Sequence, residues 1–205
     1  ELVQAAEKER LSIYRDLHDD VGSKLLSIVH AGRDNKLGDL ARTALESLRN
    51  AVSRANSPEQ SLGQFLQQLE EETRLRLEGS GHQLLWTQDE VIPTMILPSD
   101  VVFNLNQIFR ELVTNIIRHA DANQVQFRLQ NLADEFVFTV EDNGAGLATE
   151  NVEGNGLSNI KQRAAEIGSV VEWENIDPQG LRFRMSLLQR KTNTSTPSDS
   201  PQPTG

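Results

Sequence analysis

The stretch ELVTNIIRHA, residues 111–120, ends a longer run, DVVFNLNQIFRELVTNIIRHA, in which apolar residues recur every three or four positions. This spacing predicts a helix from Asp100 to Ala120. Around it, runs with apolar residues at alternate positions or in short clusters predict strands, and GLSNIKQRAAEIG predicts a helix from Gly156 to Gly168. The predicted strands are His82 to Gln88, Val125 to Leu132, Glu135 to Asp142, Ser169 to Ile176 and Leu181 to Leu188. Because hairpin-length connections join several of them, we expect a mixed, largely antiparallel sheet with helices on one face, an α/β sandwich.

Polar side chains recur on one face of the predicted helix. Glu111 and Asn115 are four residues apart and share that face, while Arg118 and His119 follow one turn later. A magnesium ion prefers oxygen ligands, so the neutral amide oxygen of Asn115 suits a metal ligand that leaves room for phosphate oxygens. The Glu111 carboxylate could orient a water of the metal shell. The other reading of this pattern is a solvated helix face.

Two glycine-containing clusters flank the end of a strand and the start of a helix. In EDNGAGL, Asp142 ends a strand, and Gly144 and Gly146 let the chain turn sharply and approach a ligand. The Asp142 carboxylate is a suitable acceptor for an adenine amino group. In EGNGLSNI, Gly154 and Gly156 precede a helix whose N-terminal amides can receive a phosphate.

Each cluster alone is common in ordinary loops, but the three in this order favour a nucleotide site. They resemble the N box and the two glycine boxes of the ATPase fold shared by histidine kinases, gyrase, Hsp90 and MutL. The resemblance implies an α/β sandwich that binds ATP and Mg²⁺ under a lid, here residues 147–153, with Leu157 among the nucleotide-binding residues. One departure is Gly180 followed by Leu181, where the family often has Gly-Thr near the adenine.

The N-terminal part of the chain predicts an antiparallel helical hairpin. One helix covers Glu1 to Ala31, the segment AGRDNKLGD forms a turn, and a second helix covers Leu40 to Ala55. Apolar residues form a stripe along the first helix that a lone helix cannot bury. We therefore expect the hairpin to pair with a second copy as a dimeric four-helix bundle.

A phosphoacceptor motif lies in this hairpin. The string EKERLSIYRDLHDDVGSKL resembles the phosphoacceptor box of histidine kinases that signal to LuxR-type response regulators. The resemblance implies a homodimer in which ATP phosphorylates His18 and the phosphoryl group passes to an aspartate of the regulator. A neutral imidazole is a competent nucleophile, and the adjacent Asp19 can accept its proton. Ser23 stands where related sequences often have Gln, which predicts weak phosphatase activity.

The composition limits the remaining possibilities. The 205 residues divide into a predicted hairpin (1–56), an ATP-binding domain (57–188) and a disordered tail rich in Thr, Ser and Pro (189–205). A formal net charge of -10 disfavours direct binding to nucleic acid or an anionic membrane. The absence of cysteine excludes disulfides and thiolate zinc sites and is compatible with the cytoplasm. Since the chain begins at Glu1, we expect an upstream sensor or membrane anchor that this sequence lacks.

Three functions remain open on these observations. The first is the cytoplasmic core of a bacterial sensor histidine kinase. The second is a nucleotide-binding signalling scaffold of the same fold that has lost phosphotransfer. The third is a coiled-coil interaction module without nucleotide binding.

Overall fold

The computed structural model describes residues 44, 47, 54, 57–147 and 155–188. The predicted hairpin and tail lie outside these residues, apart from Ala44, Ser47 and Arg54, which are helical. The described helices are α3 (Leu62–Gly79), α4 (Ser99–Asn115), the π-helical turn η1 (Ile116–Ala120) and α5 (Asn155–Glu166). The strands are β1 (Gln60–Ser61), β2 (Gln83–Gln88), β3 (Ile96–Leu97), β4 (Gln124–Asn131), β5 (Glu135–Asp142), β6 (Val170–Asn175) and β7 (Leu181–Leu188).

The main sheet has five strands in the order β2-β4-β5-β7-β6. Strand β2 runs parallel to β4, and the other neighbours are antiparallel, so the predicted mixed sheet is confirmed. In β5, Phe136, Phe138 and Val140 alternate toward the helices and are buried, as the period of two predicts. Strands β5 and β7 pair along their whole lengths, which places Asp142 opposite Leu181.

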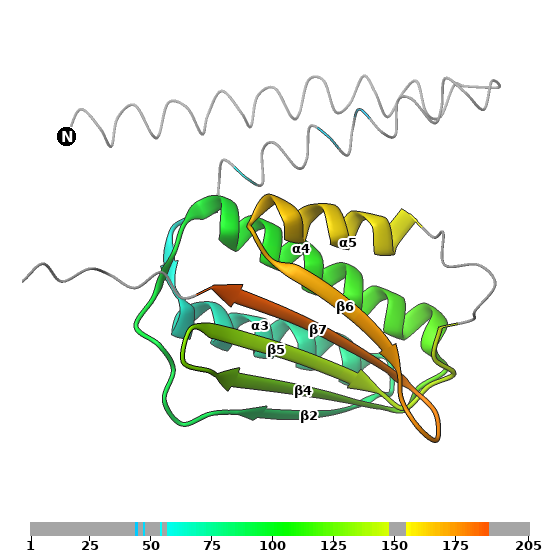
Figure 1. The fold of residues 1–205 in the computed structure, drawn as a ribbon. Coiled ribbons are helices and arrows are strands. Elements are labelled where there is room, and N and C mark those ends of the chain that lie inside the picture. The colour runs from blue at the N-terminus through cyan, green and yellow to red at the C-terminus, as the bar shows by residue number, and fades with distance from the viewer. Residues whose placement is uncertain (1–43, 45–46, 48–53, 55–56, 148–154, 189–205) are drawn as a thin grey trace, which may run out of the picture.

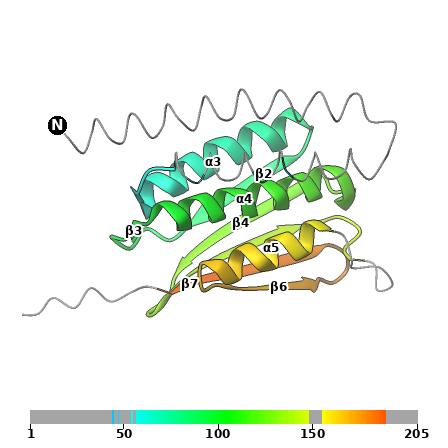
Figure 2. The same ribbon diagram turned by 90° about the horizontal axis from the view of Figure 1, so that it is seen from above.

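Three helices cover one face of this sheet, as predicted (Figure 1). Viewed from above, α3, α4 and α5 lie side by side, with α4 in the middle (Figure 2). Helix α3 packs against α4 and β2, whereas α5 packs against α4 and β6. The end of α4 and the start of α5 therefore meet above the central strands, where the candidate site lies.

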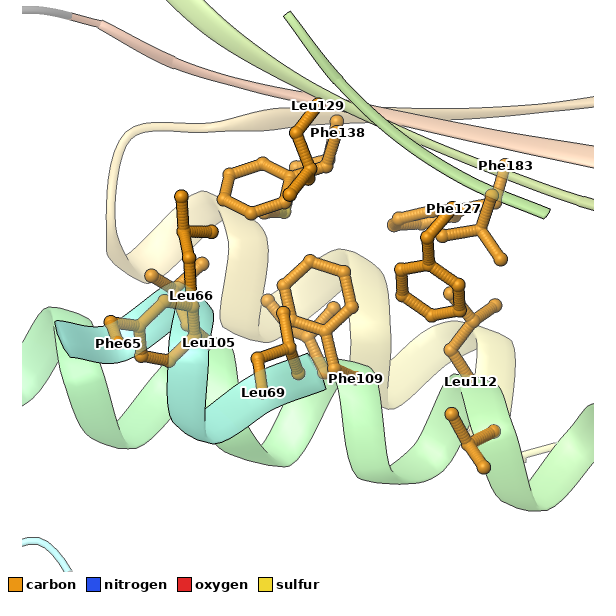
Figure 3. Close-up of a cluster of buried hydrophobic side chains, with 14 of the residues drawn as sticks. Phe65, Leu66, Leu69, Leu105, Phe109, Leu112, Phe127, Leu129, Phe138 and Phe183 are labelled. Carbon is orange, nitrogen blue, oxygen red and sulfur yellow. The ribbon is translucent and has the colours of Figure 1, made fainter. Parts of the chain in front are cut away.

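The core between helices and sheet is apolar and rich in phenylalanine (Figure 3). The Phe109 ring of α4 lies 5.0 Å from the Phe138 ring of β5 and 6.2 Å from the Phe127 ring of β4, measured between ring centroids. All three side chains are at most 1% exposed. Tilted aromatic pairs of this kind stabilise a core beyond the burial of their area. They fix α4, and with it Glu111 and Asn115, over the sheet.

Helix α3 begins at a capping box that the sequence analysis did not identify. The Gln64 backbone N–H donates to Ser61 Oγ at 3.2 Å, and the Ser61 backbone N–H donates to Gln64 Oε1 at 3.2 Å. This pair satisfies amides that the first helical turn leaves without partners. Ser61 also belongs to β1, which pairs with β3 in a small second sheet that the sequence analysis did not predict.

The predicted helix from Asp100 to Ala120 has two parts. The α-helical part ends at Asn115, and η1 continues it as one wide turn. Asp121 then adopts a φ of 51°, in the left-handed region where Asp is tolerated better than most residues, and the helix stops. The Ala120 carbonyl accepts a hydrogen bond from the Ala145 backbone N–H at 2.8 Å. The helix end is thereby tied to the segment that follows β5.

Candidate nucleotide site

A cavity of about 540 Å³ opens between the helices and the central strands. It is bordered by the last turns of α4 and η1, the end of β5, the start of α5, and β6 and β7. Most of the site residues predicted from the sequence line it: Glu111, Asn115, Arg118, His119, Asp142, Gly146, Gly156 and Leu157. Gly144 is not among the lining residues, while His18, Asp19 and Gly154 lie outside the described residues.

The polar end of the cavity is where α4 meets α5. A methyl group added at Gly156 would collide with Glu111 Oε1 and lie 3.2 Å from Asn115 Nδ2 and 3.5 Å from Asn115 Oδ1. Both side chains therefore converge on the start of α5, and glycine leaves the space between them open. Arg118 and His119 are exposed at the rim. A carboxylate, an amide and the amino end of a helix form a donor set that suits a hydrated Mg²⁺ ion and phosphates.

The other end of the cavity is mostly apolar. Its walls include Val140, Leu181 and Phe183 from the sheet and Trp173 from β6. The Trp173 and Phe183 rings lie 5.4 Å apart and are tilted by 58°. Leu181, where the resemblance led us to expect Thr, extends this apolar wall. Flat apolar walls with few polar groups are typical of sites for planar ligands.

Asp142 is the buried acid of the cavity. Its side chain is 5% exposed, and its Oδ1 accepts a hydrogen bond from the Gly144 backbone N–H at 2.9 Å. Burial raises the pKa of the Asp142 carboxyl above its ordinary 3.8, while the Gly144 and Leu181 backbone N–H groups oppose this rise. A buried acceptor at the apolar end is the polar group that a planar amino-bearing base requires for recognition.

The raised pKa of Asp142 predicts a pH dependence of stability. The folded chain holds the Asp142 proton more tightly than the unfolded chain. This proton therefore contributes to the free energy of unfolding, fully below pH 3.8, and the contribution is lost as pH rises through the folded pKa. Asp142→Asn removes the titration. We therefore expect the free energy of unfolding of the unmodified chain, minus that of the variant, to fall as pH rises from 3.8 and then level off. Urea denaturation at a series of pH values measures the difference; a rising difference would contradict the assignment.

Gly144 holds the segment after β5 against the helix end. A methyl group at this position would collide with the backbone carbonyl of Ala120 and lie 3.0 Å from Asp142 Oδ1. The Ala145 amide bonds that same carbonyl, so the backbone cannot move aside without losing a hydrogen bond. The first glycine of this cluster is therefore required by close packing of two backbone segments.

Gly144→Ala is expected to destabilise the domain by about 3 kcal/mol, because a side chain is forced into fixed backbone. Gly63→Ala on α3 is the matched control, since no atom lies within 4 Å of the added methyl group. The control should stay within about 1 kcal/mol of the unmodified chain, in the stabilising direction. Urea denaturation of the two variants gives both values, and equal stabilities would show that the close approach at Gly144 is not required.

Two contacts of the site have no signal in the sequence. Asn143 Oδ1 accepts hydrogen bonds from the Asn123 and Gln124 backbone N–H groups, both at 3.0 Å. Asn175, at the end of β6, bonds the backbone of Leu147 through both atoms of its amide. Each is an Asn beside a turn, and its partner is at least 19 residues away in sequence. Composition or spacing cannot identify such a pair.

Two features are absent from the described residues. Residues 57–147 and 155–188 contain no group of three or more His, Cys, Asp or Glu side chains placed to hold a metal ion. A magnesium site here would therefore depend on the Asn115 amide, the Glu111 carboxylate and phosphate oxygens. In the same part of the chain no helix is both long and apolar enough to cross a membrane.

One family model matches the part of the chain that contains the cavity. Residues 101–191 match the family model described as histidine kinase-, DNA gyrase B- and HSP90-like ATPase. This range contains every cavity-lining residue of α4, η1, α5 and the last three strands. The fold and the cavity agree with the expectation drawn from the N box and the two glycine boxes.

Curated relatives cover more of the chain. Sensor histidine kinase YxjM of Bacillus subtilis is 27% identical over 91% of this chain and 49% of its own length. Sensor protein VraS of Staphylococcus aureus is 26% identical over 92% of this chain and 58% of its own length. The chain thus spans about half the length of the curated relatives that it matches.

Solved structures share the fold. The histidine kinase domain of the Erythrobacter litoralis EL346 blue-light activated histidine kinase superposes with a TM-score of 0.55 at 16% identity, covering 82% of this chain and 95% of that one. Full-length ShkA in complex with AMPPNP gives a TM-score of 0.55 at 16% identity, covering 87% and 45%. The family model is that of histidine kinase-like ATPases, and the curated relatives are named a sensor histidine kinase and a sensor protein, so both comparisons agree with the fold described above.

Proposed function

We propose that the chain is the kinase core of a two-component sensor, in which ATP phosphorylates His18 and the phosphoryl group passes to an aspartate of a response regulator. The observation that carries the proposal is the cavity itself. It joins a buried carboxylate at an apolar end to a carboxylate, an amide and a helix N-terminus at a polar end. This arrangement fits adenine at one end and a triphosphate at the other.

Each end of the cavity has a distinct task. The Asp142 carboxylate accepts a hydrogen bond from the adenine amino group, and the walls that include Leu181, Phe183 and Trp173 exclude water around the base. Asn115 and Glu111 would hold a magnesium ion, which neutralises charge on the phosphate oxygens when it is bound. Arg118 and His119 are exposed at the rim of the cavity, where their side chains could contact the γ-phosphate.

The proposed transfer forms one bond and breaks one. An imidazole nitrogen of His18 attacks the γ-phosphorus, the bond from that phosphorus to the β–γ bridging oxygen breaks, and ADP leaves. The ring proton passes to Asp19, the adjacent carboxylate in the sequence. Positioning and charge neutralisation contribute most of the rate enhancement in phosphoryl transfer of this type. The phosphoryl group then passes to an aspartate carboxylate of the regulator.

Two partners belong to the proposal. The first is a second copy of the chain, which would cover the apolar stripe of the predicted hairpin. The second is a response regulator with a receiver domain, for which the resemblance of residues 7–25 favours a LuxR-type output. The names of the relatives YxjM and VraS, a sensor histidine kinase and a sensor protein, support this class of signalling.

Incubation with γ-labelled ATP and Mg²⁺ tests the proposed function. We expect acid-labile, alkali-stable phosphate on the protein, the behaviour of a phosphorus–nitrogen bond. ATP binding without labelling would instead support the inactive scaffold, and neither binding nor labelling would support a coiled-coil interaction module.

A further inference from the structure

Residues 143–147, which directly follow β5, contribute to one wall of the cavity without belonging to a helix or strand. Among them, Gly146 and Leu147 line the cavity next to Asp142. Outside regular structure, backbone amides and carbonyls require other partners to stay in one conformation. The groups that hold this segment therefore decide where the cavity wall lies.

Asn175 holds Leu147 by two hydrogen bonds. Its Oδ1 accepts from the Leu147 backbone N–H at 2.8 Å, and its Nδ2 donates to the Leu147 carbonyl at 3.0 Å. A side-chain amide has the same donor and acceptor as a peptide group, so this pair continues the pattern of a strand ladder beyond the end of β6. Both polar side-chain atoms of Asn175 therefore form hydrogen bonds with the same residue, Leu147.

Gly146 has the conformation and the space that this contact requires. Its φ is 75°, and a methyl group there would lie 2.8 Å from Asn175 Oδ1. The same methyl group would lie 3.2 Å from the Gly180 carbonyl oxygen. Gly146 is therefore close-packed against the end of β6 and the turn that follows it, and the Asn175 amide occupies the space that a side chain would need.

The β6–β7 turn holds the other end of the same segment. Gln179 Nε2 donates to the Asn143 carbonyl at 3.0 Å. Gly180 lies so close to the strand end that a methyl group there would collide with the Asp142 carbonyl oxygen. Three side-chain hydrogen bonds from Asn175 and Gln179 thus fix the segment from Asn143 to Leu147 against β6 and β7.

We propose that Asn175 is a positioning residue for ATP, acting through Leu147 and Gly146 without touching the nucleotide; the inference rests on the proposed function. Asn175 is absent from the residues that line the cavity. Its side chain is exposed, so water can replace its hydrogen bonds when it is removed, and the fold loses little. Without these hydrogen bonds the cavity wall is less ordered in the free protein. ATP then has to order the wall upon binding, which weakens its affinity.

The test uses the full chain with Asn175→Ala, and with Glu172→Ala as a control on the same strand. Glu172 is exposed on the opposite face of the sheet. For Asn175→Ala we expect the Kd for ATP and the KM of labelling to rise about tenfold, with the labelling rate at saturating ATP and the unfolding midpoint unchanged. Asn175→Asp should resemble Asn175→Ala, because a carboxylate faces the Leu147 carbonyl. Glu172→Ala should match the unmodified chain in all four measurements.

Hydrogen exchange at the Leu147 amide provides a readout that does not depend on activity. Loss of its acceptor should make this amide exchange about tenfold faster in Asn175→Ala, while the β5 amides keep their rates. Unchanged ATP affinity in that variant would overturn this inference and leave the proposed function standing. A loss of ATP binding free energy matched by an equal loss of the free energy of unfolding would do the same. Failure of the unmodified chain to bind ATP would overturn the proposed function together with it.

Discussion

His18→Gln is expected to abolish labelling of the chain by γ-labelled ATP. Glutamine has no nitrogen that can attack a phosphorus and form the acid-labile bond, so no slower route through this residue remains. ATP affinity should stay within about twofold of the unmodified value, since the sequence predicts the acceptor and the nucleotide site in different domains. Labelling after gel separation and equilibrium binding of a fluorescent ATP analogue measure the two quantities.

His30→Gln is the matched control for this experiment. His30 lies on the same predicted helix but outside the phosphoacceptor motif, and the same change of residue tests whether the helix tolerates it. Labelling of His30→Gln should equal that of the unmodified chain. Retained labelling in His18→Gln would move the acceptor elsewhere, and loss of ATP binding in that variant would contradict the separation of acceptor and nucleotide site.

The elements that the sequence predicts best are those whose pattern reflects burial. Glu135 to Asp142 and Leu181 to Leu188 were predicted as strands, and β5 and β7 have these same ends. In β5 a short apolar run marks a strand that is buried on both faces from Phe136 to Val140, and in β7 the apolar residues alternate because one face packs on the helices. The local sequence pattern is therefore enough to predict these strands without knowledge of their tertiary contacts. The same holds for α5, where Ile160 and Ala164 share the buried face.

The elements that the sequence does not predict depend on distant contacts. Strands β1 and β3 have two residues each, too few to show a period, and exist because they pair with one another. The change from α-helix to π-helical turn at Ile116 leaves the apolar pattern intact, so it has no sequence signal. The last residue of this turn is Ala120, whose carbonyl accepts the hydrogen bond from the Ala145 amide.

The candidate site also contains some residues that the sequence predicts and others that only the structure identifies. Glu111, Asn115, Asp142 and Gly156 were identified because their residue types match the chemistry of ATP and Mg²⁺ at short spacings. Asn175 was not, because a single exposed Asn at a strand end is common, and its role depends on a residue 28 positions away. Positions whose residue types match the chemistry of a ligand can be proposed from the sequence, whereas positions that hold those residues in place require the structure.

Asn115→Asp is expected to reduce magnesium-dependent labelling by about 10²-fold or more. The change is nearly isosteric, so the half-buried position should keep its packing and the unfolding midpoint should shift little. It replaces the neutral oxygen of the proposed metal ligand by a charged one beside Glu111, since both side chains converge on Gly156. Two adjacent carboxylates repel each other and the phosphates of ATP, and one of them then tends to stay protonated.

Asn106→Asp controls for the added charge. Asn106 lies on the same helix, does not line the cavity, and undergoes the same chemical change. Labelling rates for both variants over a range of magnesium concentrations, together with ATP affinity measured without magnesium, separate a metal defect from a nucleotide defect. The proposal requires that Asn106→Asp match the unmodified chain while Asn115→Asp fails at every magnesium concentration. Equal rates for Asn115→Asp and the unmodified chain would remove Asn115 from the site, because a ligand of a magnesium ion that binds the reacting phosphates should not gain a charge without affecting their transfer.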